Sequence, residues 1–277
     1  MKIKIAANGK ASGLENGKLT KIDFQALPRW IESSENIELE IELPNFHCNV
    51  GGVDPSQGQR ACLVCPRDLP GFHPETDRLD QVCDSIRPFI QNVSVVRFAG
   101  LAEPFWKSRI FELLDHLEIQ KNAQVKIIAV TNGTLVEPDV CQRWLETVPS
   151  SQLSFSLDAT TEETYVKLRR IAEFEKVVEN MDHYCRTRNP DHHVAVLSNN
   201  INTINAPEIQ HMVEMTKTHF LHYAHLTLTE PVGRRLKGIC INSVNAPIFS
   251  EARALASATA AELGVNVVFG GQWPSEK

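Results

Sequence analysis

The feature that most constrains the fold of this 277-residue chain is a repeated alternation of strand-like and helix-like segments from residue 37 onward. Isoleucine and leucine alternate with glutamate over residues 37–43, which predicts a strand with one apolar and one polar face. A helix should follow, because Leu79, Val82, Cys83 and Ile86 recur at helical spacing. Repeated units of this kind imply a parallel sheet with right-handed crossovers.

The later units follow the same pattern along the chain. We expect five further strands, at residues 93–98, 125–130, 153–157, 194–198 and 226–228. The helices between them should cover residues 105–117, 137–145, 174–181 and 207–220. Six strand–helix units are too few for an eight-fold barrel. The sequence therefore predicts the α/β class, as a partial (β/α)6 TIM-type barrel.

Three parts are expected. Residues 1–36 form an N-terminal extension in which Asn8-Gly9 and Asn16-Gly17 are turn signals, so we expect a short β-hairpin. Residues 37–235 form the barrel core. Residues 236–277 should add a C-terminal helix and a short strand.

Three of the seven cysteines lie in one loop after the first strand, at Cys48, Cys62 and Cys65. Three thiolates can hold three irons of a cubane cluster and leave the fourth iron open to a ligand. Taken alone, these residues could equally bind zinc, with His47 or His73 as the fourth ligand. A redox pair of Cys62 and Cys65 is a weaker alternative, because Cys48 would then have no role.

Polar residues follow the next strands at the same expected edge of the sheet. The second strand ends in Gly100-Leu101-Ala102-Glu103-Pro104 and the third in Thr131-Asn132-Gly133-Thr134; Ser156 and Asp158 follow the fourth, and Arg169 comes soon after. In such barrels the chemistry lies at the C-terminal ends of the strands. Each residue also has a structural alternative: Glu103 in a first helical turn, Asp158 as a helix cap, Asn132-Gly133 as a turn, and Arg169 on a solvated face.

Together these motifs resemble the radical S-adenosylmethionine (radical SAM) superfamily, closest to its SPASM and peptide-maturase branch. The similarity runs from about residue 39 to residue 233. It rests on the three cysteines, on the two motifs that end the second and third strands, and on a fourth-unit stretch that includes Phe155-Ser156-Leu157-Asp158-Ala159-Thr160 and Lys167-Leu168-Arg169-Arg170.

The resemblance implies a fold, cofactors and roles. Cys48, Cys62 and Cys65 would hold a [4Fe-4S] cluster whose open iron binds S-adenosylmethionine. Reductive cleavage of that cofactor would give a 5′-deoxyadenosyl radical for hydrogen abstraction. The cofactor would be contacted by Val64 at the adenine, by Gly100, Ala102 and Glu103 at the methionine amine, and by Ser156, Asp158 and Arg169 at ribose and carboxylate; Asn132 is a further contact or a structural residue.

The chain departs from the family pattern in three places. Thirteen residues separate Cys48 from Cys62, where three are usual, and Ala102 replaces a motif glycine. The SPASM branch carries further cysteines after the barrel, whereas this chain has only Cys240 there. We expect either a natural short form or a missing C-terminal segment.

The alternative to an enzyme is a non-catalytic partial barrel that uses the three cysteines as a structural zinc site or for partner binding. The resemblance favours the enzyme, with a peptide or small-molecule substrate and an electron donor such as flavodoxin or ferredoxin. A net charge of −6 argues against nucleic acid as a partner. The start lacks a signal-peptide pattern and no window is apolar enough for a membrane span, so we expect a cytoplasmic protein.

Overall fold

The computed structural model describes residues 1–6, 10–15, 18–22, 27–32, 36–43, 48–50, 62–65, 77–229, 236, 238–242 and 244–274. One ten-stranded sheet organises this part of the chain, in the order β10-β9-β8-β7-β6-β5-β4-β1-β2-β3. The strands are β1 (Lys2–Ile5), β2 (Ala11–Glu15), β3 (Lys18–Ile22), β4 (Ile37–Glu42), β5 (Val93–Ala99), β6 (Lys126–Thr131), β7 (Ser150–Ser156), β8 (His193–Ile201), β9 (Tyr223–Leu228) and β10 (Asn266–Gly270).

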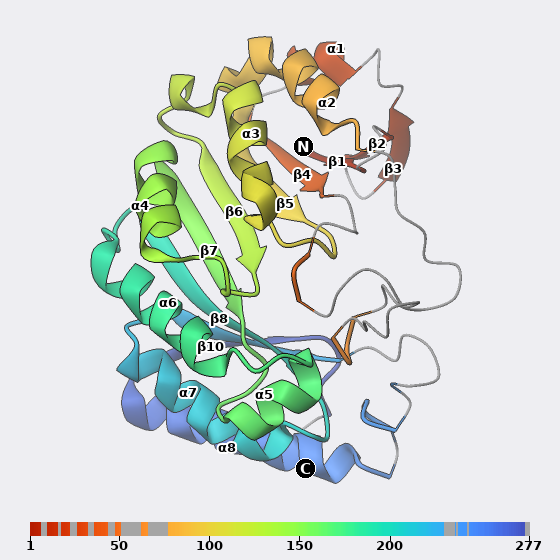
Figure 1. Ribbon diagram of the computed structural model, residues 1–277. Coiled ribbons are helices and arrows are strands. Elements are labelled where there is room, and N and C mark those ends of the chain that lie inside the picture. The colour runs from red at the N-terminus through yellow and green to blue at the C-terminus, as the bar shows by residue number, and fades with distance from the viewer. Residues whose placement is uncertain are drawn as a thin grey trace, which may run out of the picture.

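Helices connect the strands and cover one side of the curved sheet (Figure 1). They are α1 (Leu27–Glu32), α2 (Leu79–Ile86), α3 (Arg109–His116), α4 (Pro138–Thr147), α5 (Glu162–Arg169), α6 (Phe174–Thr187), α7 (Ile209–Thr218) and α8 (Ala246–Leu263). From β4 to β10 each neighbouring pair of strands is parallel. This confirms the predicted partial barrel, because the sheet curves without closing and its strands follow one another in chain order.

The N-terminal strands extend the same sheet. β1 pairs antiparallel with β2, and β2 antiparallel with β3, which confirms the hairpin extension. β1 also pairs in parallel with β4, so the extension is joined to the barrel by backbone hydrogen bonds. The turns at residues 7–9 and 16–17 lie outside the described residues. The division of the chain at residues 36 and 235 stays a prediction.

The alternating sequence of β4 gives the strand one buried apolar face and one partly exposed polar face, as predicted. Its isoleucines and leucine are buried, whereas Glu40 and Glu42 remain partly exposed on the other face. Lys2 and Lys4 of β1 pair with these glutamates, at 2.5 Å from Lys2 Nζ to Glu40 and 2.6 Å from Lys4 Nζ to Glu42. The apolar face therefore packs on the helices, and a paired set of charges faces away from them.

One connection differs from the sequence prediction. The helix expected from residue 105 begins as α3 only at Arg109, because Lys107 and Ser108 take left-handed backbone angles with φ of 51° and 61°. Helix α5 is a separate element, capped at its start by the Thr161 side chain, which accepts a hydrogen bond from the Thr164 amide. Asp158 is therefore not the cap of this helix.

The apolar core lies between the sheet and the helices, and it holds the strand ends in place. Phe105, Phe111 and Trp144 pack edge to face or tilted, with ring centroids 5.5 to 6.5 Å apart. Phe155 of β7 packs on Tyr184 of α6 at 5.7 Å. A rigid sheet of this kind fixes the loops that follow the strands. Among the described residues, no helix is long and apolar enough to cross a membrane.

Candidate active site

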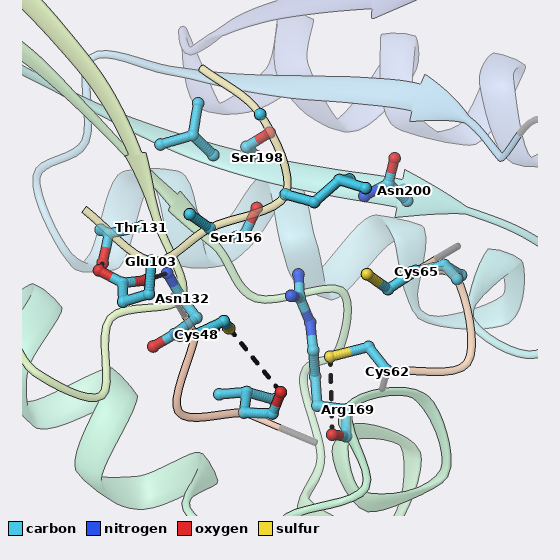
Figure 2. Close-up of a pocket in the computed structure, with 16 residues that line it drawn as sticks. Cys48, Cys62, Cys65, Glu103, Thr131, Asn132, Ser156, Arg169, Ser198 and Asn200 are labelled. Atoms are coloured by element: carbon cyan, nitrogen blue, oxygen red, sulfur yellow. Dashed lines mark hydrogen bonds between the residues drawn. The ribbon is translucent and has the colours of Figure 1, made fainter. Parts of the chain in front are cut away.

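A pocket of about 280 Å³ opens at the C-terminal ends of the parallel strands, where the sequence predicts the chemistry. Sixteen residues line it, and most come from strand ends or from the cysteine segments (Figure 2). All three predicted metal ligands are among them, as are seven of the eight predicted cofactor contacts: Val64, Gly100, Ala102, Glu103, Asn132, Ser156 and Arg169. Residues distant in sequence therefore meet in one place.

The two cysteine-containing segments that line the pocket are anchored to different elements of the fold. Leu63 donates its backbone amide to the Leu168 carbonyl at 2.7 Å, and the Cys65 amide closes a turn on the Cys62 carbonyl at 2.9 Å. The Cys62-to-Cys65 turn is thus fastened to the end of α5. The Cys62 thiol also lies 3.7 Å from the Arg169 carbonyl oxygen.

Cys48 is held instead by the end of β6. The Asn132 side-chain amide donates to Asn49 Oδ1 at 3.0 Å and toward Cys48 Sγ at 3.8 Å. Asn49 Nδ2 in turn donates to the Thr134 hydroxyl at 2.7 Å. Because the two segments have separate anchors, the unusual length of chain between Cys48 and Cys62 does not set where the thiols lie. Residues 51–61 of that connection lie outside the described residues.

The arrangement of the thiols bears on the choice between a cluster and a single metal ion. Among the described residues, no three His, Cys, Asp or Glu side chains converge closely enough to hold one ion. A cubane cluster does not require such convergence, since its cysteines bind different irons. The histidines of the zinc alternative, His47 and His73, lie outside the part of the chain that the structure describes.

Glu103 is the buried carboxylate of the pocket, with 2% of its surface exposed. Its oxygens accept hydrogen bonds from the Thr131 hydroxyl at 2.8 Å, the Asn132 backbone amide at 2.7 Å and the Phe105 amide at 3.3 Å. Burial raises the pKa of Glu103 to about 7, although these three donors and Arg169 act in the opposite direction. A carboxylate accepts about four hydrogen bonds, so one acceptor position remains for a ligand cation.

Arg169 is the buried cation on the other side of the pocket. Figure 2 shows its guanidinium reaching from the end of α5 toward Ser156 and Asn200. Nη2 lies 2.7 Å from Asp158 Oδ2 in an ion pair, and Nε is buried without a hydrogen bond. A buried donor such as Nε is costly unless a partner binds it. Burial acts to lower the pKa of Arg169, but Asp158, Cys62 and Tyr165 together raise it by more, so the pKa is raised and the side chain stays charged.

Asp158 lies behind Arg169 and is not among the residues that line the pocket. Its Oδ1 accepts from the Asn200 amide at 2.6 Å, and its own amide donates to Asn199 Oδ1 at 2.7 Å. It takes a left-handed backbone conformation, with φ of 62°, which these bonds hold in place. Burial raises the pKa of Asp158, against the effect of Arg169. Its contact with the cofactor stays a prediction; the structure shows it orienting Arg169.

Two glycines fit the backbone to the pocket. Gly100 has φ of 101°, and a Cβ there would lie 3.2 Å from the Leu43 carbonyl oxygen. Gly133 has φ of 80°, and a Cβ would lie 2.8 Å from Val177 Cγ1. Both positions therefore require glycine. Asn132 stabilises the turn at Gly133, since its Oδ1 accepts a hydrogen bond from the Thr134 amide at 3.0 Å.

Sequence reasoning missed several residues that line the pocket, including Ser198 and Asn200. Ser198 and Asn200 alternate near the end of β8, so both face the pocket side of the sheet. That two-residue spacing of polar side chains at the end of an otherwise apolar strand was the available signal.

The donor set fits the cofactors that the sequence motifs imply. Three thiols suit iron, Glu103 suits an ammonium group, and the buried guanidinium of Arg169 suits a carboxylate. An α-amino acid group carries both charges, so the ends of such a ligand match the two buried groups of the pocket.

The chain has the same fold as several solved structures at low sequence identity. Streptococcus suis SuiB bound to precursor peptide SuiA has a TM-score of 0.60 at 14% identity, over 89% of this chain and 51% of that one. The anSMEcpe structure with bound AdoMet gives 0.62 at 15%, over 84% and 64%. Methylornithine synthase (PylB) gives 0.54 at 12%, over 92% and 80%. The chain thus spans about half the length of the SuiB structure.

A comparison with curated proteins finds no match. The family model for the radical SAM superfamily matches residues 47–216, which is well over half of the chain. The match includes the cysteines and the ends of β5 to β8, and it favours an enzyme over the non-catalytic alternative. The chain belongs to the radical SAM superfamily, whose members are enzymes that use a [4Fe-4S] cluster and S-adenosylmethionine.

Proposed function

We propose that Cys48, Cys62 and Cys65 hold the [4Fe-4S] cluster and that the pocket beside them binds S-adenosylmethionine for hydrogen abstraction from a peptide or small molecule. One observation carries the assignment of the pocket: Arg169, paired with Asp158, places a buried guanidinium beside the three thiols and opposite the buried carboxylate of Glu103. When bound, the two cofactors supply an organic radical able to remove a hydrogen atom from a substrate.

The residues of the chain would then bind and orient the cofactor. Glu103 receives the ammonium group and Arg169 the carboxylate, so the amino-acid end is held by opposite charges from two sides. Gly100 allows the backbone to approach the cofactor closely, because glycine has no Cβ. Ser156 offers a hydroxyl to the ribose, and Val64 offers backbone to the adenine. Asp158 keeps Arg169 in place.

Burial supports this division of roles. Both charged groups are largely screened from water by the strand ends, so their attraction for a ligand is stronger than at the surface. The same burial makes Glu103 hold its proton near neutral pH in the absence of a cation. Arrival of the ammonium group would favour loss of that proton.

We infer the substrate class from the neighbours in fold. One SuiB structure contains a precursor peptide and one anSMEcpe structure contains a peptide, whereas PylB is named as a methylornithine synthase. A peptide or a small molecule is therefore our proposal for the substrate, and a flavodoxin or ferredoxin our proposal for the electron donor.

The test is anaerobic reconstitution with iron and sulfide, followed by chemical reduction with S-adenosylmethionine and detection of 5′-deoxyadenosine by mass spectrometry. The wild type should form it, and Cys62→Ala should not. Cys141→Ala is the matched control, because Cys141 is buried within α4 and does not line the pocket. A wild type that binds iron and forms no 5′-deoxyadenosine, or a Cys62→Ala variant with full yield, would contradict the proposal.

A further inference from the structure

Asn132, predicted above as a cofactor contact or a structural residue, has a different set of partners in the structure. Its side chain is 6% exposed, and each of its amide atoms has a neighbour within hydrogen-bond distance. These neighbours are Cys48, Asn49 and Thr134, which belong to the loop of the first cysteine and to the turn after β6.

The hydrogen bonds fix which way the Asn132 amide faces. Its Oδ1 lies 3.0 Å from the Thr134 backbone nitrogen, which can only donate. The oxygen must therefore face Thr134, and the NH2 group must face Cys48 and Asn49. One of its hydrogens goes to Asn49 Oδ1 at 3.0 Å, which leaves the other for Cys48 Sγ at 3.8 Å.

Three side chains close into a ring with one consistent set of donors. Asn132 donates to Asn49 Oδ1, Asn49 donates to the Thr134 hydroxyl at 2.7 Å, and that hydroxyl donates to Asn132 Oδ1 at 2.6 Å. Each donor is used once, and such chains of hydrogen bonds strengthen one another. The ring makes the N–H directed at Cys48 a fixed feature of the fold, unlike a mobile surface amide.

Two further hydrogen bonds join this ring to Glu103, the carboxylate proposed to bind the amino group of the cofactor. The Asn132 backbone amide donates to Glu103 Oε2 at 2.7 Å, and the Thr131 hydroxyl donates to Oε1 at 2.8 Å. One residue thus contacts both the first cysteine and the carboxylate proposed for the methionine amine. The turn that it forms is rigid, because Gly133 beside it is packed against Val177 and Phe155.

We propose that Asn132 is a positioning residue for the cluster: its side-chain amide donates an N–H···S hydrogen bond to the thiolate of Cys48 and raises the reduction potential of the cluster. The inference rests on the proposed role of Cys48 as an iron ligand. The reduced cluster carries one more negative charge, so an N–H dipole directed at a ligand sulfur stabilises it more than the oxidised form. Hydrogen bonds to the sulfurs are among the features that set these potentials.

The test is a potentiometric EPR titration of the reconstituted cluster without substrate, in wild type, Asn132→Ala and Thr134→Val. Asn132→Ala removes the donor to Cys48. Thr134→Val is the matched control: it breaks the ring, but the Thr134 backbone amide still orients Asn132. We expect the reduced-to-oxidised ratio at a fixed potential to fall at least about threefold in Asn132→Ala, about 30 mV for a one-electron couple. Thr134→Val should stay close to wild type.

Equal potentials in all three proteins would overturn the proposal, and so would equal shifts in the two variants, because Asn132 would then act only as a member of the ring. If Asn132→Ala keeps its melting temperature but takes up no iron while Thr134→Val does, Asn132 is needed to place Cys48, which supports the proposal. If Asn132→Ala does not fold, Asn132→Leu replaces it, since leucine is close in size, carries no charge and lacks the donor. An unchanged potential there is equally decisive against the proposal. Failure of the proposed function would differ, because the wild type itself would then assemble no cluster.

Discussion

Glu103 allows a prediction whose size follows from the structure. Its pKa is about 7 in the folded protein, against an ordinary value of 4.5, because burial disfavours the charged form. This difference corresponds to about 3 kcal/mol, at about 1.4 kcal/mol per pKa unit. The cofactor-free protein should lose about this much free energy of unfolding as the pH rises from about 4 to 8.

The sign follows from proton binding. Between these two pKa values the unfolded chain has released the Glu103 proton while the folded chain still holds it. The folded state thus binds more protons, and stability falls as the pH rises. Above about pH 7 both states are ionised and the loss is complete.

Glu103→Gln removes this titration and keeps the shape of the side chain. Its Oε1 can accept from the Asn132 amide while Nε2 donates to the Thr131 hydroxyl. Urea unfolding of both proteins at several pH values gives the difference in free energy of unfolding. That difference should change by about 3 kcal/mol in favour of the variant as the pH rises from about 4 to 8. Parallel curves, within about 1 kcal/mol, would refute the buried, proton-holding carboxylate.

The same group sets the pH dependence of cofactor binding. With a pKa of about 7, the ionised fraction of Glu103 rises from about one tenth at pH 6 to about nine tenths at pH 8. Because only the carboxylate pairs with an ammonium group, and the α-amino group of the cofactor itself loses its proton with a pKa of about 8, S-adenosylmethionine should bind the cluster-free protein about fourfold more tightly at pH 8. Anaerobic equilibrium dialysis measures this, and Glu103→Gln should bind weakly at both pH values. A wild-type affinity independent of pH would contradict the assignment.

Two further substitutions test the residues that hold the pocket in shape. Asp158→Asn leaves the buried charge of Arg169 without its counterion, so the free energy of unfolding should fall by about 3 to 5 kcal/mol. The double variant with Arg169→Met should recover part of that loss, whereas a loss under about 1 kcal/mol in Asp158→Asn alone would contradict the buried ion pair. Gly133→Ala should lower the free energy of unfolding by about 2 to 5 kcal/mol in thermal unfolding, because φ is left-handed and the new Cβ would lie 2.8 Å from Val177. Gly264→Ala is the control: its φ is also left-handed but the space around it is open, so the loss should be about 1 to 2 kcal/mol. Equal losses would show that the Val177 side chain moves aside and that the contact contributes nothing.

The fold was accessible from the sequence because its signals are local. Strand and helix periodicity gives the order of the units, and short connections between parallel strands leave few topologies. The start of α3 was not accessible, since no composition signal marks the left-handed pair Lys107 and Ser108. The parallel pairing of β1 with β4 was also missed, because it depends on packing between segments far apart in the chain.

The sequence predicted which residues lie at the site better than it predicted what each of them does there. Strand-end motifs bring seven of eight expected contacts to one pocket. Asp158 and Asn132 show the limit: both are polar residues at strand ends, yet one orients Arg169 and the other orients Cys48 and Glu103. Which polar side chain faces the ligand depends on rotamers and neighbours that a single sequence does not encode in readable form.

The most direct test of the central claim is electron–nuclear double resonance on the reduced, cluster-loaded protein with S-adenosylmethionine labelled with ¹⁵N at the amino group and ¹⁷O at the carboxylate. If three cysteines leave one iron open, the carboxylate and the amino group, once the ammonium has lost a proton, should both bind that iron. Both labels should then couple strongly to the cluster spin, and Arg169→Met should weaken the carboxylate signal. A fully loaded cluster with the cofactor bound and neither coupling present would contradict the account.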